Sequence, residues 1–303
     1  MAVINIRDPQ RELNTYSQVQ HQLPEYPRQV RIETASMCPM ACPFCHAFGD
    51  FKPLTRAKGR MSKELYTAIL DDIAAWPKPP EEIVPTNFGE LAMNPHWEWM
   101  LHELSRKIPG SRIHLVTTGI WLNQTNLEKL ALVPNLKYVN FSVNAFFGET
   151  WARVHGQPAK HMPAVVRAVH EFRDRRPDVE VNVSMVQDPD ITTDLEKDLF
   201  LNYWAPFGPV TVSPASYAGN PKHQPDPPVS LSCRSIIDGL VISDQGVVGT
   251  GCCFDGSLEL AIGKFPEESL LAIWKGEKLK GLVDLHNSGR RADIPLCRTC
   301  TFS

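Results

Sequence analysis

Residues 38–48 read CPMACPFCHAF and place Cys38, Cys42 and Cys45 at a Cys-x3-Cys-x2-Cys spacing. Three thiolates can bind three irons of a four-iron cluster, which leaves the fourth iron open to a substrate or cofactor. Structural metal sites fill every coordination position, whereas catalytic sites keep one open. The spacing therefore predicts a catalytic site. A zinc knuckle with His46 as fourth ligand is the alternative.

Composition excludes several classes of protein. The 303 residues are 43% hydrophobic and 21% charged, with a net charge of −3, so no electrostatic argument favours nucleic acid or an anionic membrane as partner. No apolar run approaches the ~20 residues of a membrane span, and the N-terminus, MAVINIRDPQ, lacks the apolar stretch of a signal peptide. We expect a cytoplasmic protein whose eight cysteines are used mainly to bind metal rather than to form disulfides.

Strand-like and helix-like segments alternate along most of the chain. The expected strands are residues 28–34, 82–88, 112–116, 136–143, 179–186 and 210–213. The expected helices are residues 62–76, 96–107, 127–132, 163–175 and 195–204. Six such repeats favour a parallel sheet but cannot close an eight-stranded barrel. The predicted fold class is therefore α/β, an open, partial (β/α)6 TIM-like barrel, with its active site at the C-terminal ends of the strands.

The sequence divides into an arm, a core and a small C-terminal domain. Residues 1–27 are predicted to form the arm, residues 28–220 the core and residues 229–303 the C-terminal domain. A proline-rich linker at residues 217–229 separates the last two. The C-terminal domain is expected to contain a hairpin and two helices, at residues 239–249, 268–274 and 277–287.

Polar residues follow three of the predicted core strands. They are Asn87–Glu90, Thr117–Gly119 and Ser142–Asn144. Because active sites of such folds gather at the carboxyl ends of parallel strands, these residues are candidates for ligand binding. Ordinary capping of strand ends is the alternative for each of them.

A second group of cysteines lies in the C-terminal part of the chain. Its members are Cys233, Cys252, Cys253, Cys297 and Cys300. Four thiolates suffice for a complete iron–sulfur cluster, and they suit zinc equally well. Spacing alone leaves both metals open.

Both cysteine groups resemble those of one enzyme superfamily. The first loop, with Phe44 before its third cysteine, resembles the cluster loop of the radical SAM enzymes. In that family the open iron is chelated by S-adenosylmethionine, which is cleaved to a 5'-deoxyadenosyl radical. Residues 240–255 (LVISDQGVVGTGCCFD), 262–289 and 296–300 (LCRTC) are similar to the auxiliary-cluster domain called SPASM or twitch. The resemblance implies two [4Fe-4S] clusters and S-adenosylmethionine as cofactors.

The resemblance also implies roles for individual residues. Gly89-Glu90 resembles the end of a Gly-Gly-Glu motif that holds the amino group of S-adenosylmethionine, with Phe88 in place of the first glycine. Residues 141–156 resemble a segment in which a serine and an acidic residue contact the ribose, and Asn144 replaces the acid. The residues expected to bind the cofactor are Phe44, Gly89, Glu90, Thr118, Ser142 and Asn144.

Eight cysteines leave one thiol beyond the ligands of two clusters. The expected ligands are Cys38, Cys42 and Cys45 for the first cluster, and Cys233, Cys252, Cys297 and Cys300 for the second. Neighbouring side chains on an extended segment point apart, so one of the adjacent pair should ligate and the other stay free. We predict Cys252 as ligand and Cys253 as the catalytic thiol. A buried thiol that only packs as a small hydrophobe is the alternative.

These expectations predict an enzyme that uses radical chemistry, and they leave more than one reaction open. A thiol that returns hydrogen to the opposite face of a substrate carbon would make the protein an epimerase of an amino sugar or aminocyclitol. Alternatives are a dehydrogenase that passes an electron to the auxiliary cluster, a peptide-modifying epimerase, and a non-enzymatic iron–sulfur or zinc scaffold. An electron donor such as flavodoxin or ferredoxin is expected as partner. Candidate substrate contacts are His114, Trp121, Tyr217, Arg234 and Asp255.

Overall fold

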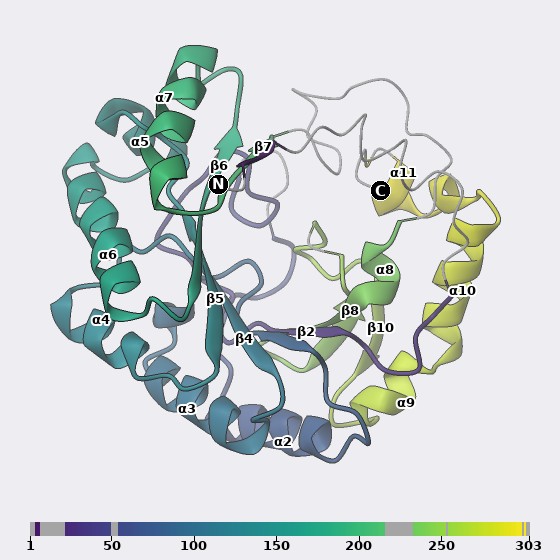
Figure 1. The fold of residues 1–303 in the computed structure, drawn as a ribbon. Helices are drawn as coiled ribbons and strands as arrows, with labels where there is room; N and C mark the ends of the chain where they lie inside the picture. The colour runs from purple at the N-terminus through teal and green to yellow at the C-terminus, as the bar shows by residue number, and fades with distance from the viewer. Residues whose placement is uncertain are drawn as a thin grey trace.

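The computed structural model describes residues 4–6, 22–49, 54–215, 233–252, 254–298 and 300. These residues form a ten-stranded sheet in the order β1-β7-β6-β5-β4-β3-β2-β8-β9-β10. Six neighbouring strands of that sheet follow one another in the chain and are parallel. They are β2 (Gln29–Ile32), β3 (Glu82–Val84), β4 (Arg112–Thr117), β5 (Leu136–Ser142), β6 (Glu180–Gln187) and β7 (Val210–Pro214). The predicted open, partial (β/α)6 barrel is confirmed (Figure 1).

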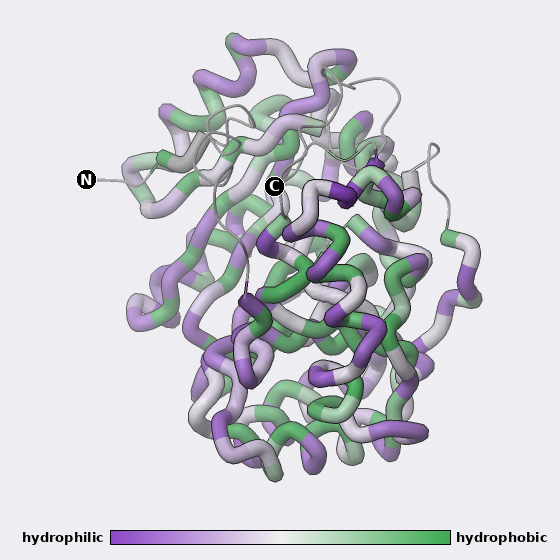
Figure 2. The backbone as a smooth tube through the Cα atoms, turned by 90° about the vertical axis from the view of Figure 1, so that its right-hand side faces the viewer, coloured by the Kyte–Doolittle hydropathy of each residue, from purple (hydrophilic) through white to green (hydrophobic). Residues whose placement is uncertain are grey.

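Helices cover the outer side of this sheet (Figure 1). They are α2 (Lys63–Ala74), α3 (Trp97–Lys107), α4 (Gln124–Ala131), α5 (Gly148–His155), α6 (Met162–Arg175) and α7 (Asp194–Trp204). Helix α2 begins where the sequence predicts, because the Ser62 side chain accepts a hydrogen bond from the Leu65 N–H at 3.1 Å. Hydrophobic residues recur along the helices and strands with hydrophilic residues between them, as Figure 2 shows. This pattern buries one face of each element.

Two of the boundaries that differ from the sequence prediction have local reasons. Strand β3 ends at Val84 rather than residue 88, because Pro85 lacks the N–H that would continue the ladder. Helix α4 starts at Gln124, since the Asn123 side chain caps it by accepting from the Asn126 N–H at 2.9 Å. Helix α5 was not predicted at all.

The C-terminal part extends the same sheet beyond β2. Its elements are α8 (Ser235–Asp238), β8 (Gly239–Ile242), β9 (Val247–Thr250), β10 (Ala261–Lys264), α9 (Leu270–Trp274), α10 (Glu277–Asn287) and α11 (Pro295–Arg298). Strand β8 pairs in parallel with β2, and β8, β9 and β10 form an antiparallel meander. Helices α9, α10 and α11 lie on the side of the molecule opposite α4 and α6 (Figure 1).

The other edge of the sheet is formed by the N-terminal arm. Strand β1 (Ile4–Ile6) pairs in parallel with β7. The proposed linker, residues 217–229, lies outside the described residues, so the domain boundaries on either side remain predictions. Within the described part of the chain, no helix has the length and apolar character needed to cross a bilayer.

Candidate active site

A cavity of about 360 Å³ lies at the C-terminal ends of the six core strands. Its wall includes residues that end or follow each of β2 to β7. All nine residues predicted to hold the first cluster or S-adenosylmethionine line it: Cys38, Cys42, Phe44, Cys45, Gly89, Glu90, Thr118, Ser142 and Asn144. Residues that are more than a hundred positions apart in sequence therefore share one space.

The three thiols of the cysteine loop have raised pKa values, mainly because they are buried. The pKa of Cys38 rises to about 12, and the Glu90 carboxylate adds to the effect of burial. At Cys45, the backbone N–H groups of residues 47–49 oppose the rise because they favour a thiolate. Iron bound here would displace the thiol protons. The loop thus provides three sulfurs of the kind that iron in a cluster requires.

The three thiols of one loop form the donor set that a four-iron cluster takes, since each of three irons accepts one thiolate. His46, the fourth ligand in the zinc alternative, packs its ring 4.8 Å from the ring of Phe254.

Helix α5 brings a histidine to the cysteine loop. The His155 Nδ1 lies 3.5 Å from the Cys42 Sγ, and its Nε2 lies 3.1 Å from the Val143 carbonyl oxygen. Because a carbonyl can only accept, Nε2 carries the proton that it donates to Val143. Burial lowers the pKa of His155 to about 4, so the ring is neutral near pH 7. The Ala41 N–H also donates to the His155 carbonyl at 2.9 Å, which ties the loop to the end of α5.

The turn after β3 is fixed by a glycine and a buried carboxylate. A Cβ on Gly89 would lie 1.8 Å from the Ala35 carbonyl oxygen, so only glycine fits there. Each Glu90 oxygen accepts two hydrogen bonds, at 2.8–2.9 Å, from donors on Thr117, Thr118 and Trp121. Burial raises the pKa of Glu90, and these hydrogen bonds oppose the rise. Glu90 therefore holds the end of β4 in place as well as lining the cavity.

Asn144 connects the ends of β5 and β6. It adopts the left-handed conformation, with a φ of 61°, which asparagine tolerates better than most residues. Its Oδ1 accepts from the Val186 N–H at 2.9 Å, and its own N–H donates to the Ser184 carbonyl at 3.0 Å. The predicted ribose contact from Ser142 or Asn144 remains a prediction, although both residues line the cavity.

Four cysteines of the second group line one small cavity. Cys233, Cys252, Cys297 and Cys300 line a space of about 20 Å³. Burial raises the pKa of Cys297 to about 12, and the nearby Arg291 opposes this. Four sulfurs in one place fit the predicted second ligand set. Cys253, the predicted hydrogen donor, lies outside the described residues.

Phe254 lines both cavities and so forms a wall between them. Neither Phe254 nor His155 was predicted as a site residue. The only sequence signal for them is position, since Phe254 follows the vicinal cysteines and His155 lies in the segment that resembles a ribose-binding motif.

Four of the predicted substrate contacts, His114, Trp121, Arg234 and Asp255, are not among the residues that line the larger cavity. His114 bonds Glu82 at 3.1 Å, and Trp121 donates to Glu90. Arg234 pairs with Asp238, while the Asp255 carboxylate accepts from two backbone N–H groups of the following turn. Tyr217 lies outside the described residues.

Comparison with known proteins supplies a family model and a fold. Residues 233–301 match the SPASM model, described as an iron–sulfur cluster-binding domain. No protein of curated function matches the chain.

Several solved structures share the fold at low sequence identity. BtrN in complex with AdoMet and 2-DOIA is 16% identical with a TM-score of 0.60, and the alignment covers 93% of this chain and 94% of BtrN. Streptococcus suis SuiB bound to precursor peptide SuiA is 12% identical with a TM-score of 0.61, covering 90% and 69% of the two chains. Native anSMEcpe with bound AdoMet is 14% identical with a TM-score of 0.64, covering 85% and 83%. The chain therefore has the fold of the radical SAM enzymes and carries a SPASM iron–sulfur cluster-binding domain at residues 233–301.

Proposed function

We propose that the chain cleaves S-adenosylmethionine and removes a hydrogen atom from a carbon of a small polar molecule. The observation that supports this most is the shared lining of the larger cavity by the three thiols of one loop, the Gly89-Glu90 turn and the ends of β4 and β5. When bound there, a four-iron cluster and S-adenosylmethionine supply a 5'-deoxyadenosyl radical. The chain's own residues hold the loop, exclude water and shape the space around the reacting carbon.

The proposed substrate is an amino sugar or aminocyclitol. The BtrN structure, which contains AdoMet and 2-DOIA, aligns over 94% of its own length. The SuiB structure with a precursor peptide aligns over 69% of its length. The first comparison leaves almost no part of BtrN without a counterpart, and it favours a small molecule over a peptide.

We infer that the reaction is an epimerisation in which Cys253 is the hydrogen donor. Cys253 lies in sequence between Cys252, which lines the smaller cavity, and Phe254, which lines both. Its S–H bond would break as a new C–H bond forms on the opposite face of the substrate radical. One electron from a donor such as flavodoxin or ferredoxin and one proton from solvent would then restore the thiol.

Oxidation of a secondary alcohol is the second candidate. The wall that Phe254 shares between the two cavities favours it, because electrons could pass from the substrate to the second cysteine group over a short path. The substrate radical would lose one electron to the cluster held there and one hydroxyl proton to a base, which leaves a carbonyl group.

Reaction in deuterated water separates these outcomes. The reconstituted chain, S-adenosylmethionine, a reductant and a panel of aminocyclitols and amino sugars are incubated without oxygen. Epimerisation predicts one solvent deuterium at the inverted carbon, whereas oxidation predicts a product that lacks two hydrogen atoms and carries no deuterium. Cys253→Ala should abolish the epimer while 5'-deoxyadenosine still forms. An epimer made by Cys253→Ala at the wild-type rate would refute the donor assignment.

A further inference from the structure

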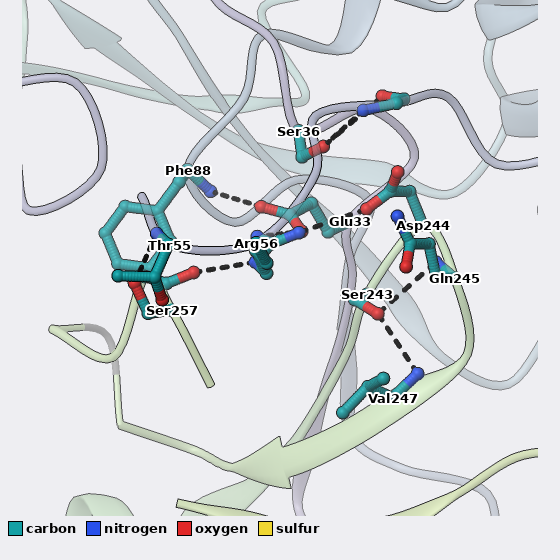
Figure 3. Close-up of polar contacts among 12 residues, drawn as sticks. Glu33, Ser36, Thr55, Arg56, Phe88, Ser243, Asp244, Gln245, Val247 and Ser257 are labelled. Atoms are coloured by element: carbon teal, nitrogen blue, oxygen red, sulfur yellow. Dashed lines mark hydrogen bonds and ion pairs between the residues drawn. The ribbon is translucent and has the colours of Figure 1, made fainter. Parts of the chain in front are cut away.

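A buried arginine joins the first core strand to the C-terminal domain. The Arg56 Nη2 pairs with the Glu33 Oε2 at 2.5 Å, and its Nη1 pairs with the Asp244 Oδ1 at 3.1 Å (Figure 3). Its Nε donates to the Gly256 carbonyl oxygen at 2.7 Å. The side chains of Glu33, Asp244 and Arg56 are 0%, 1% and 14% exposed. Breaking an ion pair this deeply buried is strongly destabilising, because removal of one partner leaves an uncompensated charge.

Asp244, which the C-terminal domain contributes to this cluster, lies in a turn that is held by its own hydrogen bonds. Ser243 to Gly246 connect β8 to β9, and the Ser243 Oγ accepts the N–H groups of Gln245 and Val247 at 3.3 and 3.0 Å (Figure 3). Across the boundary, a Cβ on Gly59 would lie 2.5 Å from the Asp244 Oδ2. The turn is therefore held by its own hydrogen bonds. The backbone at Gly59, three residues after Arg56, fits closely against the Asp244 carboxylate.

The core end of the cluster reaches the wall of the larger cavity. Glu33 directly follows β2, five residues before Cys38. Its Oε1 accepts from the Phe88 N–H at 3.4 Å (Figure 3). Phe88 lines the cavity and precedes the Gly89-Glu90 turn. One carboxylate thus contacts both Arg56 and the loop expected to bind S-adenosylmethionine.

Residues 254–257 of the C-terminal domain press against the cysteine loop. A Cβ on Gly256 would lie 2.5 Å from the His46 carbonyl oxygen, so the two backbones touch. The Thr55 N–H donates to the Ser257 Oγ at 3.1 Å (Figure 3). The Phe254 ring packs against His46 in the same place.

We propose that Arg56 is a positioning residue that fixes residues 254–257 against the cysteine loop and so sets the spacing of the two cysteine-lined cavities. Simple stability does not require a charged cluster here, since well-packed apolar residues can replace a buried ion pair without loss. A guanidinium, however, can hold two carboxylates and a carbonyl at fixed angles through its planar set of donors. The catalytic consequence rests on the proposed function, whereas the structural consequence does not.

Hydrogen exchange of the reconstituted protein tests the structural part. In Arg56→Gln, backbone amides of residues 33–48 and 254–257 should exchange about ten-fold faster or more, because a buried charged hydrogen-bond network is lost. Arg56→Lys, which keeps the positive charge but lacks the planar set of donors, should speed exchange by an intermediate amount. Arg106→Gln is the matched control, since Arg106 is exposed and pairs with Glu103 on its own helix. Helix α6 should be unchanged in all variants.

Milder changes keep the test decisive if Arg56→Gln does not fold. Asp244→Asn and Gly59→Ala both act at the Asp244 carboxylate and leave Arg56 in place, and each should speed exchange of residues 254–257 about three-fold. Unchanged protection of residues 254–257 in a folded Arg56 or Asp244 variant would overturn the proposal.

The catalytic part of the proposal predicts that loss of Arg56 uncouples cleavage of S-adenosylmethionine from product formation and does not abolish cleavage. In Arg56→Gln, the ratio of 5'-deoxyadenosine to product should rise about five-fold or more relative to wild type. Faster exchange with an unchanged ratio would limit Arg56 to a structural role and refute its positioning of the reaction. If wild type makes no 5'-deoxyadenosine, the proposed function fails, and hydrogen exchange still decides whether Arg56 fixes the two segments.

Discussion

At the scale of single residues, the cavity wall is shaped by groups whose identity the packing dictates. Glu90 uses both carboxylate oxygens twice, and a carboxylate offers about four acceptor positions. The sequence marked Glu90 as a cofactor residue, but it gave no sign of this second role, because the four donors lie 27–31 residues away. The sequence likewise gave no sign that His155 contacts Cys42, because the two residues are 113 positions apart.

Gly89→Ala tests how tightly the turn after β3 is fitted. The added methyl group would meet the backbone oxygen of Ala35, which cannot move without shifting the end of β2. We expect a loss of about 2 kcal/mol or more in the free energy of unfolding, measured with urea. Gly281→Ala is the control, because its Cβ meets nothing within 4 Å in helix α10, and alanine should stabilise that helix by about 0.5–1 kcal/mol. Equal stability of both variants would contradict the close fit.

Glu33 predicts a specific dependence of stability on pH. Burial raises the pKa of Glu33 from 4.5 to about 7, although Arg56 opposes the rise; the nearby Asp244 adds to it. Between these values the native state binds more protons than the unfolded chain, so stability should fall as pH rises from about 4.5 to 7. In Glu33→Gln this part of the slope should be missing. Urea unfolding at pH 5, 6, 7 and 8 measures it, and identical slopes for both proteins would refute the shift.

At the scale of elements, local signals predicted helices well and strand ends less well. The Ser62 cap and the four-residue spacing of apolar side chains located helix α2. Helix α10 has the bounds that its sequence predicts, Glu277–Asn287. Helix α5 was missed because its eight residues resemble part of a motif, and its hydrophobic residues, Trp151, Ala152 and Val154, are too few to show a helical period. The pairing of β8 with β2 joins residues about 210 apart, which no local signal predicts.

Gly156→Ala tests whether the end of helix α5 supports the cysteine loop. Gly156 has a φ of 63°, and a Cβ there would lie 2.9 Å from the Ala41 Cβ within the loop. We expect the variant to bind less iron than wild type after anaerobic reconstitution, because the loop can no longer dock. Gly289→Ala is the matched control, with a φ of 73° and no atom within 4 Å of the added methyl group. Both variants bear a similar backbone strain of about 1 kcal/mol, so equal iron contents would show that the contact with Ala41 is unimportant.

At the scale of the whole molecule, one sheet carries both cysteine groups. Strand β2 leads into the first group and pairs with β8, which leads through β9 to Cys252. The sequence located seven ligand candidates from spacing and resemblance, and the structure gathers them in two cavities that share Phe254. The shared wall was not predictable, since it depends on how two distant segments pack.

Two cluster sites predict separable iron contents. Fully reconstituted wild type should hold about eight irons and eight sulfides per chain, since each four-iron cluster contributes half. Cys42→Ala and Cys300→Ala should each reduce the count to about four. Zinc at the second site would instead leave wild type with about four irons and one zinc ion, which elemental analysis would detect.

The most direct measurement of the central claim is the yield of 5'-deoxyadenosine from the reconstituted chain, given S-adenosylmethionine and a one-electron reductant without oxygen. Wild type and Cys300→Ala should both form it, because the radical is generated at the larger cavity. Cys42→Ala should form none, since it loses a ligand of the open-sided cluster. No 5'-deoxyadenosine from wild type that carries its full complement of iron, or an equal yield from Cys42→Ala, would contradict the assignment of this cavity.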